Sequence, residues 1–346
     1  EHVIRARFAD AAFFVREDVK RKLEDFRPQL ATLSFQKKLG SMLDKAARLE
    51  QLTAALAPRL GLDPDETATA LRAAHLAKAD LATQMVVEMT SLQGIMGREY
   101  ALRSGETPAV AQAIREHYLP AGAGDALPAS RAGLVIGLAD RLDSLAGLFA
   151  AGLAPTGSAD PFGLRRAALG VTLLLTGRAL DLDLRPVLDE AVTLLPAAVQ
   201  PATPDARAKL MDEVLAFIAG RLRAQLLEAG YRHDVVEAVL AAQAANPHRA
   251  ALAVQQLAAW THSADWAATL AAYARCVRIT RDQREQPPLT PEALTEPAEQ
   301  ALYAAYQQAA GQPVRTVDEF FAVLLPLIRH DHPGTMEASL YSDQPD

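Results

Sequence analysis

The sequence predicts an all-α fold, and three observations support this prediction. Aromatic residues make up only 5% of the chain, whereas half of all residues are hydrophobic, with alanine and leucine prominent among them. These aliphatic residues favour helix, and the scarce aromatic residues are those that favour strand. Apolar residues also recur three and four positions apart, which is the spacing of a helix face. We therefore expect helices along nearly the whole chain.

The first well-marked helix is expected over residues 39–60. Its apolar residues share one side, which leaves Lys45 and Arg48 on the side expected to face outward. Gly61 is expected to end it, because glycine commonly follows the last turn of a helix. The dipeptide Asp63-Pro64 then predicts an N-cap followed by proline at the first helical position. A second helix should begin there.

Proline and glycine predict where the later elements begin and end. Residues 118–130 contain two of each and are expected to form a loop. Asp160-Pro161 and Thr203-Pro204 each predict the start of a helix. Three prolines make residues 196–204 the clearest candidate for a domain boundary. One further helix face, expected to pack in a core, carries Trp266, Leu270, Tyr273 and Val277.

Composition and charge limit the classes of function. The single cysteine, Cys276, excludes an internal disulfide and a cysteine-based zinc site. The apolar run Ala167–Gly177 has 11 residues, fewer than the roughly 20 that cross a bilayer. We therefore expect no membrane partner, no signal peptide and a cytoplasmic location. The net charge is −7, yet residues 1–60 carry 12 Lys and Arg against 8 Asp and Glu, so this segment can attract a polyanion.

Nucleotide-binding and hydrolase motifs are absent from the sequence. It contains no GxxxxGK[ST] loop, GxGxxG fingerprint, HExxH helix or GxSxG elbow. We therefore predict no catalytic residue, no metal ligand set and no cofactor in this chain. An ATP-dependent ligation would need a site for the triphosphate and its magnesium on another polypeptide.

Residues 31–150 resemble the helical domain of HD-type metal phosphohydrolases in the order and spacing of their helices. In this resemblance, His117 corresponds to the later histidine motif and Asp140 to the closing aspartate. The central His-Asp dyad is missing, because the corresponding helix reads His75, then Lys78, then Asp80. An ammonium group would repel a metal cation, so Lys78 is expected to pair with Asp80 or Asp140. We interpret this domain as a retained scaffold and keep a metal-dependent phosphohydrolase as the alternative.

A second resemblance covers nearly the whole chain. Seven segments, in the same order, resemble the beta subunit of the bacterial tetrameric glycyl-tRNA synthetase. They are Arg7–Phe14, Phe35–Leu49, Ala77–Met89, Leu92–Ala101, Glu116–Pro120, Leu138–Phe149 and Pro155–Gly170. The chain begins at Glu1 and lacks the family's amino-terminal region, which suggests a start inside a longer protein. Within the fourth segment, Gly94 and Gly97 are expected to permit a turn or a close helix approach rather than to bind a ligand.

This resemblance implies a division of labour. In the family, a separate alpha subunit uses ATP and magnesium to activate glycine, and the beta subunit grips glycine tRNA and supports the heterotetramer. The carboxy-terminal part is similar to the helical anticodon-binding domain of arginyl-type synthetases, with Tyr273–Arg281 matching its basic helix. A purely structural scaffold for the alpha subunit is a third reading. After Ile328 this chain departs from the family's final helical segment.

Five arginines are candidates for contact with RNA, because guanidinium groups bind phosphates and stack on bases. They are Arg275, Arg278 and Arg281 on the basic helix, and Arg165 and Arg166 near a helix start. The alternative for the first three is ion pairing with Asp282 or Glu285. For Arg165 and Arg166 it is a salt bridge to Asp160 or Asp140.

We accordingly divide the chain into five segments. They are a linker or end of a preceding domain (1–30), a degenerate HD-like domain (31–150), a connecting helical body (151–204), an anticodon-binding-like domain (205–330) and a flexible tail (331–346).

Overall fold

The computed structural model describes residues 2–157, 159–281 and 290–329, and these are all-α, as predicted. The strands β1 (Ser34–Gln36) and β2 (Gly40–Ser41) form a small antiparallel pair. The predicted tail 331–346 and the candidate partners Asp282 and Glu285 lie outside the described residues. The likeness to an HD-type fold stays a prediction. Among the described helices, none is long and apolar enough to cross a membrane.

Contacts between residues divide the chain into two compact units. Unit 1 comprises residues 1–228 and 240–250, and unit 2 comprises residues 229–239 and 251–346. Unit 1 contains α1 (His2–Asp18), η1 (Leu23–Thr32), α2 (Met42–Arg59), α3 (Pro64–Leu76), η2 (Ala79–Ala82), α4 (Gln84–Glu88), η3 (Thr90–Leu92), α5 (Ile95–Arg103), α6 (Pro108–Glu116), α7 (Arg131–Ala150), α8 (Leu164–Gly177), α9 (Leu184–Thr193) and α10 (Pro204–Glu228). Helices α11 (His233–Gln243) and α12 (Pro247–Trp260) each contain residues of both units. The other elements of unit 2 are α13 (Trp266–Thr280), η4 (Pro291–Ala293), α14 (Pro297–Ala310) and α15 (Val317–Arg329).

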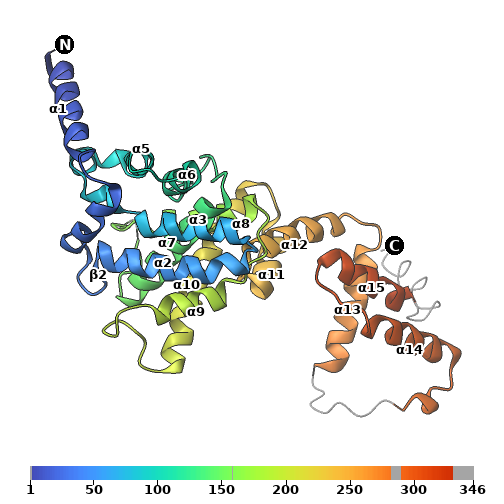
Figure 1. Ribbon diagram of the computed structural model, residues 1–346. Coiled ribbons are helices and arrows are strands. Elements are labelled where there is room, and N and C mark those ends of the chain that lie inside the picture. The colour runs from blue at the N-terminus through green and yellow to red at the C-terminus, as the bar shows by residue number, and fades with distance from the viewer. Residues whose placement is uncertain (1, 158, 282–289, 330–346) are drawn as a thin grey trace. The chain divides into compact units, whose positions relative to one another are not determined.

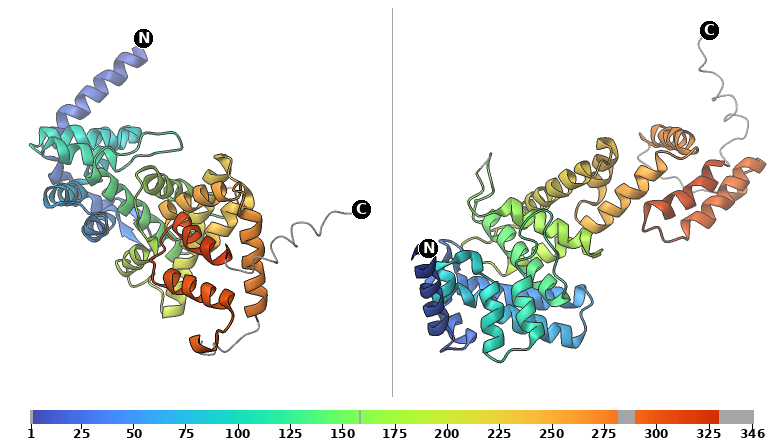
Figure 2. Two further views of the ribbon diagram at one scale, coloured as in Figure 1. Left: turned by 90° about the vertical axis from the view of Figure 1, so that its right-hand side faces the viewer. Right: turned by 90° about the horizontal axis from the view of Figure 1, so that it is seen from above.

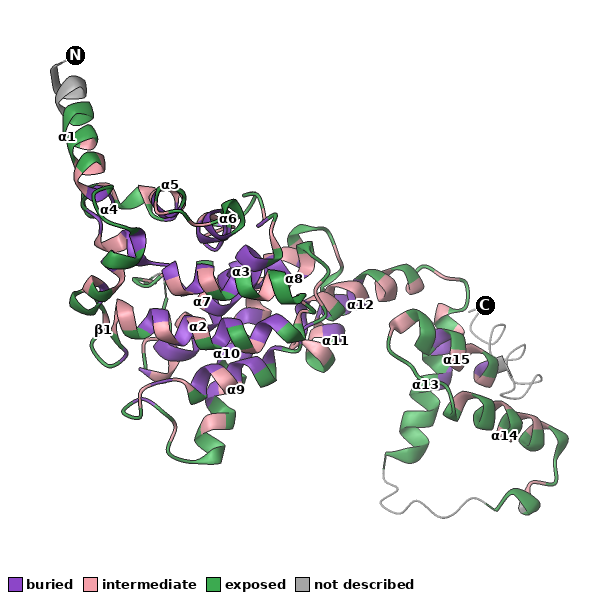
Figure 3. Cartoon of the chain, in the orientation of Figure 1, coloured by how far each residue is buried: buried purple, intermediate pink, exposed green. Residues whose placement is uncertain are grey.

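Helix α7 forms the centre of unit 1 (Figure 1). It contacts α2, α3, α6, α8, α9 and α10, and most of its residues are buried. Its sequence is apolar around nearly the whole circumference, which is typical of a helix enclosed by others. Figure 3 shows the buried residues gathered in these helices. Because α10 packs on α7 and α8, the helix after the proline-rich segment 196–204 contacts the bundle that precedes it.

Three predicted boundaries before residue 131 are confirmed, which are the start of α3, the end of α2 and the 118–130 loop. The carboxylate of Asp63 accepts a hydrogen bond from the backbone N–H of Glu66 at 2.8 Å, and Pro64 is the first residue of α3. Gly61 follows α2 with a φ of +67°, a conformation that glycine adopts without strain. The loop predicted over residues 118–130 separates α6 from α7. Local signals therefore determine these boundaries.

Two expectations about unit 1 are wrong. Helix α8 begins at Leu164 rather than beside Pro161, because Gly163 takes the N-cap position with a left-handed backbone. The Asp160 carboxylate still accepts hydrogen bonds from the first N–H groups of α8, at 2.8 and 2.9 Å. Lys45 and Arg48 are buried rather than outward, since only 4% and 5% of each is exposed.

Unit 2 has a smaller buried core. Helices α14 and α15 lie side by side (Figure 2). Trp260 stacks on Phe321 with ring centroids 4.6 Å apart, and its indole N–H donates to Asp318 at 2.8 Å. The expectation that one face of α13 packs in a core is wrong for three of its four residues. Leu270, Tyr273 and Val277 are exposed.

Candidate functional site

A network of buried charges occupies the position of the predicted degenerate site. The ammonium group of Lys78 lies 2.8 Å from Oδ2 of Asp140, which settles the choice between Asp80 and Asp140 in favour of Asp140. Lys45 lies 3.0 Å from Oδ1 of the same carboxylate and 2.8 Å from Asp143. Burial opposes ionisation of Asp140, but the two ammonium groups outweigh it and hold its pKa well below the usual value. Asp140 is therefore a carboxylate clamped between two lysines.

Lys78 reaches this position through an unusual backbone conformation. It is the N-cap of η2 and has a φ of +70°, in the left-handed region that few residues other than glycine adopt. Its ammonium group also lies 4.0 Å from the centre of the Tyr118 ring, a cation–π geometry. Burial lowers the pKa of Lys78 despite the attraction of Asp140. The surrounding structure thus holds a strained residue where its positive charge meets Asp140 and the ring.

Asp80 has a structural role close to Lys78. Its Oδ2 accepts hydrogen bonds from the backbone N–H groups of Gly94 at 2.6 Å and Gly97 at 3.1 Å. Gly94 has a φ of +75°, and a Cβ atom on Gly97 would lie 2.8 Å from Ile114. The two glycines therefore provide a turn and a close helix approach, as predicted, and the Asp80 carboxylate fixes both.

His117 is fully buried and neutral. Its Nδ1 lies 2.6 Å from the carbonyl oxygen of Ile114, so Nδ1 carries the proton and donates it. Its Nε2 has no hydrogen-bond partner within the described part of the chain. Burial and the nearby charge of Lys78 hold the pKa of His117 well below its usual value. Its ring packs on Tyr118, with centroids 3.9 Å apart.

His75 belongs to a different contact group. Its Nε2 lies 3.2 Å from Glu24 and its Nδ1 lies 3.2 Å from Glu50, at a partly exposed position. The structure thus brings Lys78, Asp80, His117 and Asp140 into one electrostatic cluster and leaves His75 outside it.

These residues do not fit the metal ion of an HD-type site. Two ammonium groups neutralise Asp140, and the described residues contain no group of three or more His, Cys, Asp or Glu side chains arranged to hold a metal. A divalent cation beside Lys78 would meet direct repulsion. The cluster is therefore an ion-pair network that ties α2 and the start of η2 to α7.

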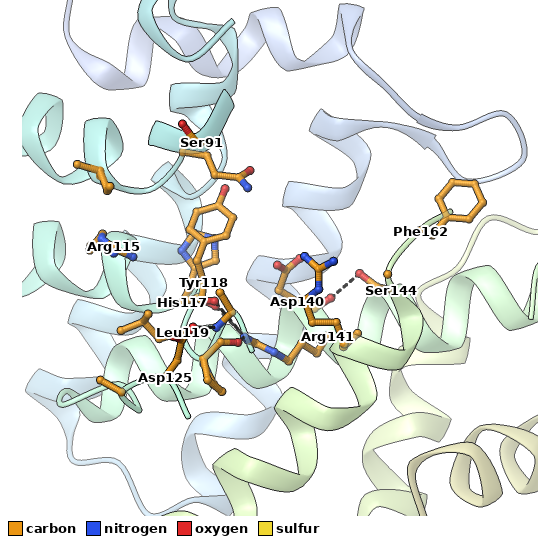
Figure 4. A pocket seen from close by; sticks show the side chains of 18 residues that line it. Ser91, Arg115, His117, Tyr118, Leu119, Asp125, Asp140, Arg141, Ser144 and Phe162 are labelled. Atoms are coloured by element: carbon orange, nitrogen blue, oxygen red, sulfur yellow. Dashed lines mark hydrogen bonds between the residues drawn. The ribbon is translucent and has the colours of Figure 1, made fainter. Parts of the chain in front are cut away.

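A cavity of about 690 Å³ opens next to this cluster (Figure 4). Its walls include Tyr118, Asp140, Arg141 and Phe162. Arg141 donates to the backbone carbonyl groups of His117, Tyr118 and Pro120 at 2.9 to 3.2 Å, which holds the 118–130 loop against α7. The cavity therefore has a wall fixed by a buried guanidinium group.

The predicted RNA-binding arginines of unit 1 differ in their surroundings. The guanidinium group of Arg165 donates to the carbonyl oxygens of Gly157 and Ala159. Arg166 is exposed and lines the 690 Å³ cavity. Neither side chain forms a salt bridge to Asp160 or Asp140. Asp160 instead caps α8.

The predicted arginines of unit 2 are all exposed. Arg275 and Arg278 lie on α13, and Arg281 is the residue that follows it. The guanidinium group of Arg278 bonds to the carbonyl oxygen of Ala274, one turn earlier in its own helix, at 3.3 Å. Their contact with RNA stays a prediction.

The sequence interpretation missed three members of the buried network, which are Lys45, Arg48 and Asp143. Arg48 donates to Oδ1 of Asp143 at 2.6 Å, and Asp143 is completely buried. One signal was available, because Asp143 stands three residues after Asp140 in a helix that is apolar on every side. Two acids in such a helix require buried cations as partners.

The chain belongs to the family described as glycyl-tRNA synthetase beta subunit, whose model matches residues 1–241. It is 44% identical over 315 residues to the glycine–tRNA ligase beta subunit of Desulforudis audaxviator, an alignment that covers 90% of this chain and 45% of that protein. The corresponding protein of Myxococcus xanthus is 43% identical over 330 residues, covering 94% of this chain and 47% of that protein. The glycine–tRNA ligase beta subunit of Clostridioides difficile is 40% identical over 308 residues, an alignment that covers 89% of this chain and 44% of that protein. The chain spans about half the length of these curated relatives.

Proposed function

We propose that this chain is the tRNA-recognising part of a glycine–tRNA ligase. It binds glycine tRNA in the cytoplasm while a separate alpha subunit carries out the aminoacylation with ATP and magnesium. The observation that carries the proposal is the family membership together with relatives 40 to 44% identical that are named glycine–tRNA ligase beta subunit. A ligase subunit can contribute to the reaction by binding tRNA while another subunit holds the groups that react.

The chemistry of the residues supports a binding role. Lys78 and Lys45 neutralise Asp140, which corresponds to the closing aspartate in the HD resemblance. The sequence also lacks a phosphate-cradling loop for ATP. These two features favour a chain that positions RNA for chemistry elsewhere.

The exposed row Arg275, Arg278 and Arg281 is the proposed contact with the anticodon. Residues three apart on a helix lie on neighbouring positions of its surface, so guanidinium groups there can reach successive phosphates or unstacked bases. Exposure of all three leaves their charged groups accessible. Each such contact contributes roughly 1–3 kcal/mol.

A gel-shift titration with glycine tRNA at two salt concentrations tests the proposal. We expect the logarithm of the affinity to fall steeply with the logarithm of the salt concentration, because phosphate contacts release counterions. Arg278→Ala should weaken binding about fivefold or more. The control is Arg103→Ala, an exposed arginine paired with Glu99 in unit 1, which should leave binding unchanged. Unchanged binding in Arg278→Ala would count against the proposed anticodon contact.

Two other readings predict different results. A metal-dependent phosphohydrolase would purify with stoichiometric manganese, iron or zinc, and His117→Ala would lose it. A scaffold for the alpha subunit would copurify with that subunit after all tRNA has been removed, and it would show no affinity for tRNA by itself. Elemental analysis and copurification therefore separate the three.

A further inference from the structure

Two adjoining cavities in unit 1 share the guanidinium-bearing residue Arg166. The first is the 690 Å³ cavity beside Asp140, and the second, of about 660 Å³, lies between the 118–130 loop, α8 and α10. Arg166 and Ala121 line both of them. A ligand that enters either cavity therefore meets the same positive charge.

The walls of both cavities carry an excess of positive charge, although the whole chain has a net charge of −7. In the first cavity, Arg115 and Arg166 have no carboxylate partner within residues 2–157, 159–281 and 290–329. In the second, Arg165, Arg166 and Arg221 face one acid, Glu228. An exposed cation without a partner attracts an anion, and phosphate suits the donor fork of arginine.

The acids of the first cavity do not cancel this charge. Asp140 is neutralised from behind by Lys45 and Lys78. Asp125 accepts hydrogen bonds from the backbone N–H groups of Ala121 and Gly122, at 2.9 and 3.1 Å, which order the 118–130 loop. It keeps its negative charge, but three arginines line the same cavity, which are Arg115, Arg141 and Arg166. The walls are thus both positive and fixed.

An exposed aromatic ring, that of Phe162, lines the first cavity. Phe162 is 43% exposed, which is high for a phenylalanine, and it precedes Arg166 by four residues. Figure 4 shows its ring on the side opposite Arg115. An exposed ring in the same cavity as Arg166 can stack with a flat heterocycle while the arginine binds an attached anion.

We propose that the first cavity binds a nucleoside monophosphate unit, with its base against Phe162 and its phosphate at Arg166. The unit can be a free nucleotide or a nucleotide unstacked from an RNA strand, because the phosphate, ribose and base are the same in both. This site is separate from the arginine row of α13, and a chain that failed to recognise glycine tRNA would still contain it.

Titration calorimetry on the 346-residue chain tests the site with AMP, GMP, CMP and UMP. We expect at least one of them to bind, and the matching nucleoside and inorganic phosphate each to bind about tenfold more weakly or worse. Arg166→Gln should reduce the affinity about tenfold through loss of a charged hydrogen bond, and Phe162→Ala by a similar factor through loss of stacking. Both residues are exposed, so thermal unfolding should confirm that the variants remain folded. The control Arg16→Gln removes an exposed arginine of α1 and should bind as the parent chain does.

A second arm uses a single-stranded RNA tetranucleotide. Binding of the free monophosphate, weakened by Arg166→Gln and Phe162→Ala, identifies a small-molecule site. Binding of the tetranucleotide alone, weakened by the same two variants, identifies an RNA strand as the source. The proposal is overturned if neither probe binds, or if both variants bind as tightly as Arg16→Gln.

Discussion

The ammonium group of Lys78 lies 2.8 Å from Oδ2 of Asp140, where an HD-type domain would place a metal ion against that carboxylate. The lysine supplies a positive charge that is covalently attached to the fold, and Lys45 supplies a second at 3.0 Å. These two ion pairs stabilise the packing of α2 and the start of η2 on α7.

Removal of the Lys78 charge should destabilise unit 1. In Lys78→Met, Asp140 retains only Lys45, and a mostly buried carboxylate loses its closest partner. We expect the free energy of unfolding to fall by about 3 kcal/mol, as measured by urea titration. The matched control is Lys20→Met, which removes an exposed ion pair with Glu17 and should cost less than about 1 kcal/mol. Equal losses in the two variants would contradict a structural role for the Lys78 pair.

Gly97 should be intolerant of a side chain. A Cβ atom there would lie 2.8 Å from Cγ2 of Ile114 and 3.0 Å from Oδ2 of Asp80, so Gly97→Ala should lower the free energy of unfolding by about 1–3 kcal/mol. Gly220→Ala is the control, because Gly220 lies inside α10 with open space around its Cβ position. That variant should be more stable by about 0.5–1 kcal/mol. Thermal unfolding of both variants measures the two shifts, and a stabilised Gly97→Ala would show that the approach of α5 to α6 is looser than described.

His117 should make the fold sensitive to mild acid. Its pKa in the folded state lies well below the usual value, because burial and Lys78 oppose its protonation. The unfolded chain gains a proton on this residue below about pH 6.5, whereas the folded chain does not. The free energy of unfolding should therefore fall as the pH drops below about 6.5, by up to about 1.4 kcal/mol per pH unit for one such group.

Urea titrations between pH 7.5 and 5.5 test this dependence. His117→Gln should show a shallower loss of stability toward acid than the parent chain, even if its stability at pH 7.5 is lower. His262→Gln, which alters an exposed histidine, should keep the parent dependence. Parallel curves for the parent and His117→Gln would rule out His117 as the source.

Local signals in the sequence predicted the fold class and many helix ends. Asp63-Pro64 determines the start of α3 because an N-cap and a proline act within one turn. Asp160-Pro161 predicted the right helix, but Gly163 in a left-handed conformation moved its start to Leu164. Such a shift depends on the surrounding loop, which spacing alone does not describe.

The buried network was only partly predictable, because its members come from helices far apart in the sequence. The sequence indicated that Lys78 would meet a carboxylate, and the fold selected Asp140. Lys45 and Arg48 lie beside the apolar stripe of α2, so periodicity placed them outward. The two acids Asp140 and Asp143 on the fully enclosed helix α7 draw them inward instead.

Competition binding with glycine tRNA tests the central claim most directly. Labelled glycine tRNA is bound to the chain and displaced by unlabelled glycine tRNA, by the same tRNA with its anticodon replaced, or by an unrelated tRNA. We predict that the last two compete about tenfold more weakly, because base contacts distinguish the anticodon. Equal competition by all three RNAs would contradict a chain that recognises glycine tRNA.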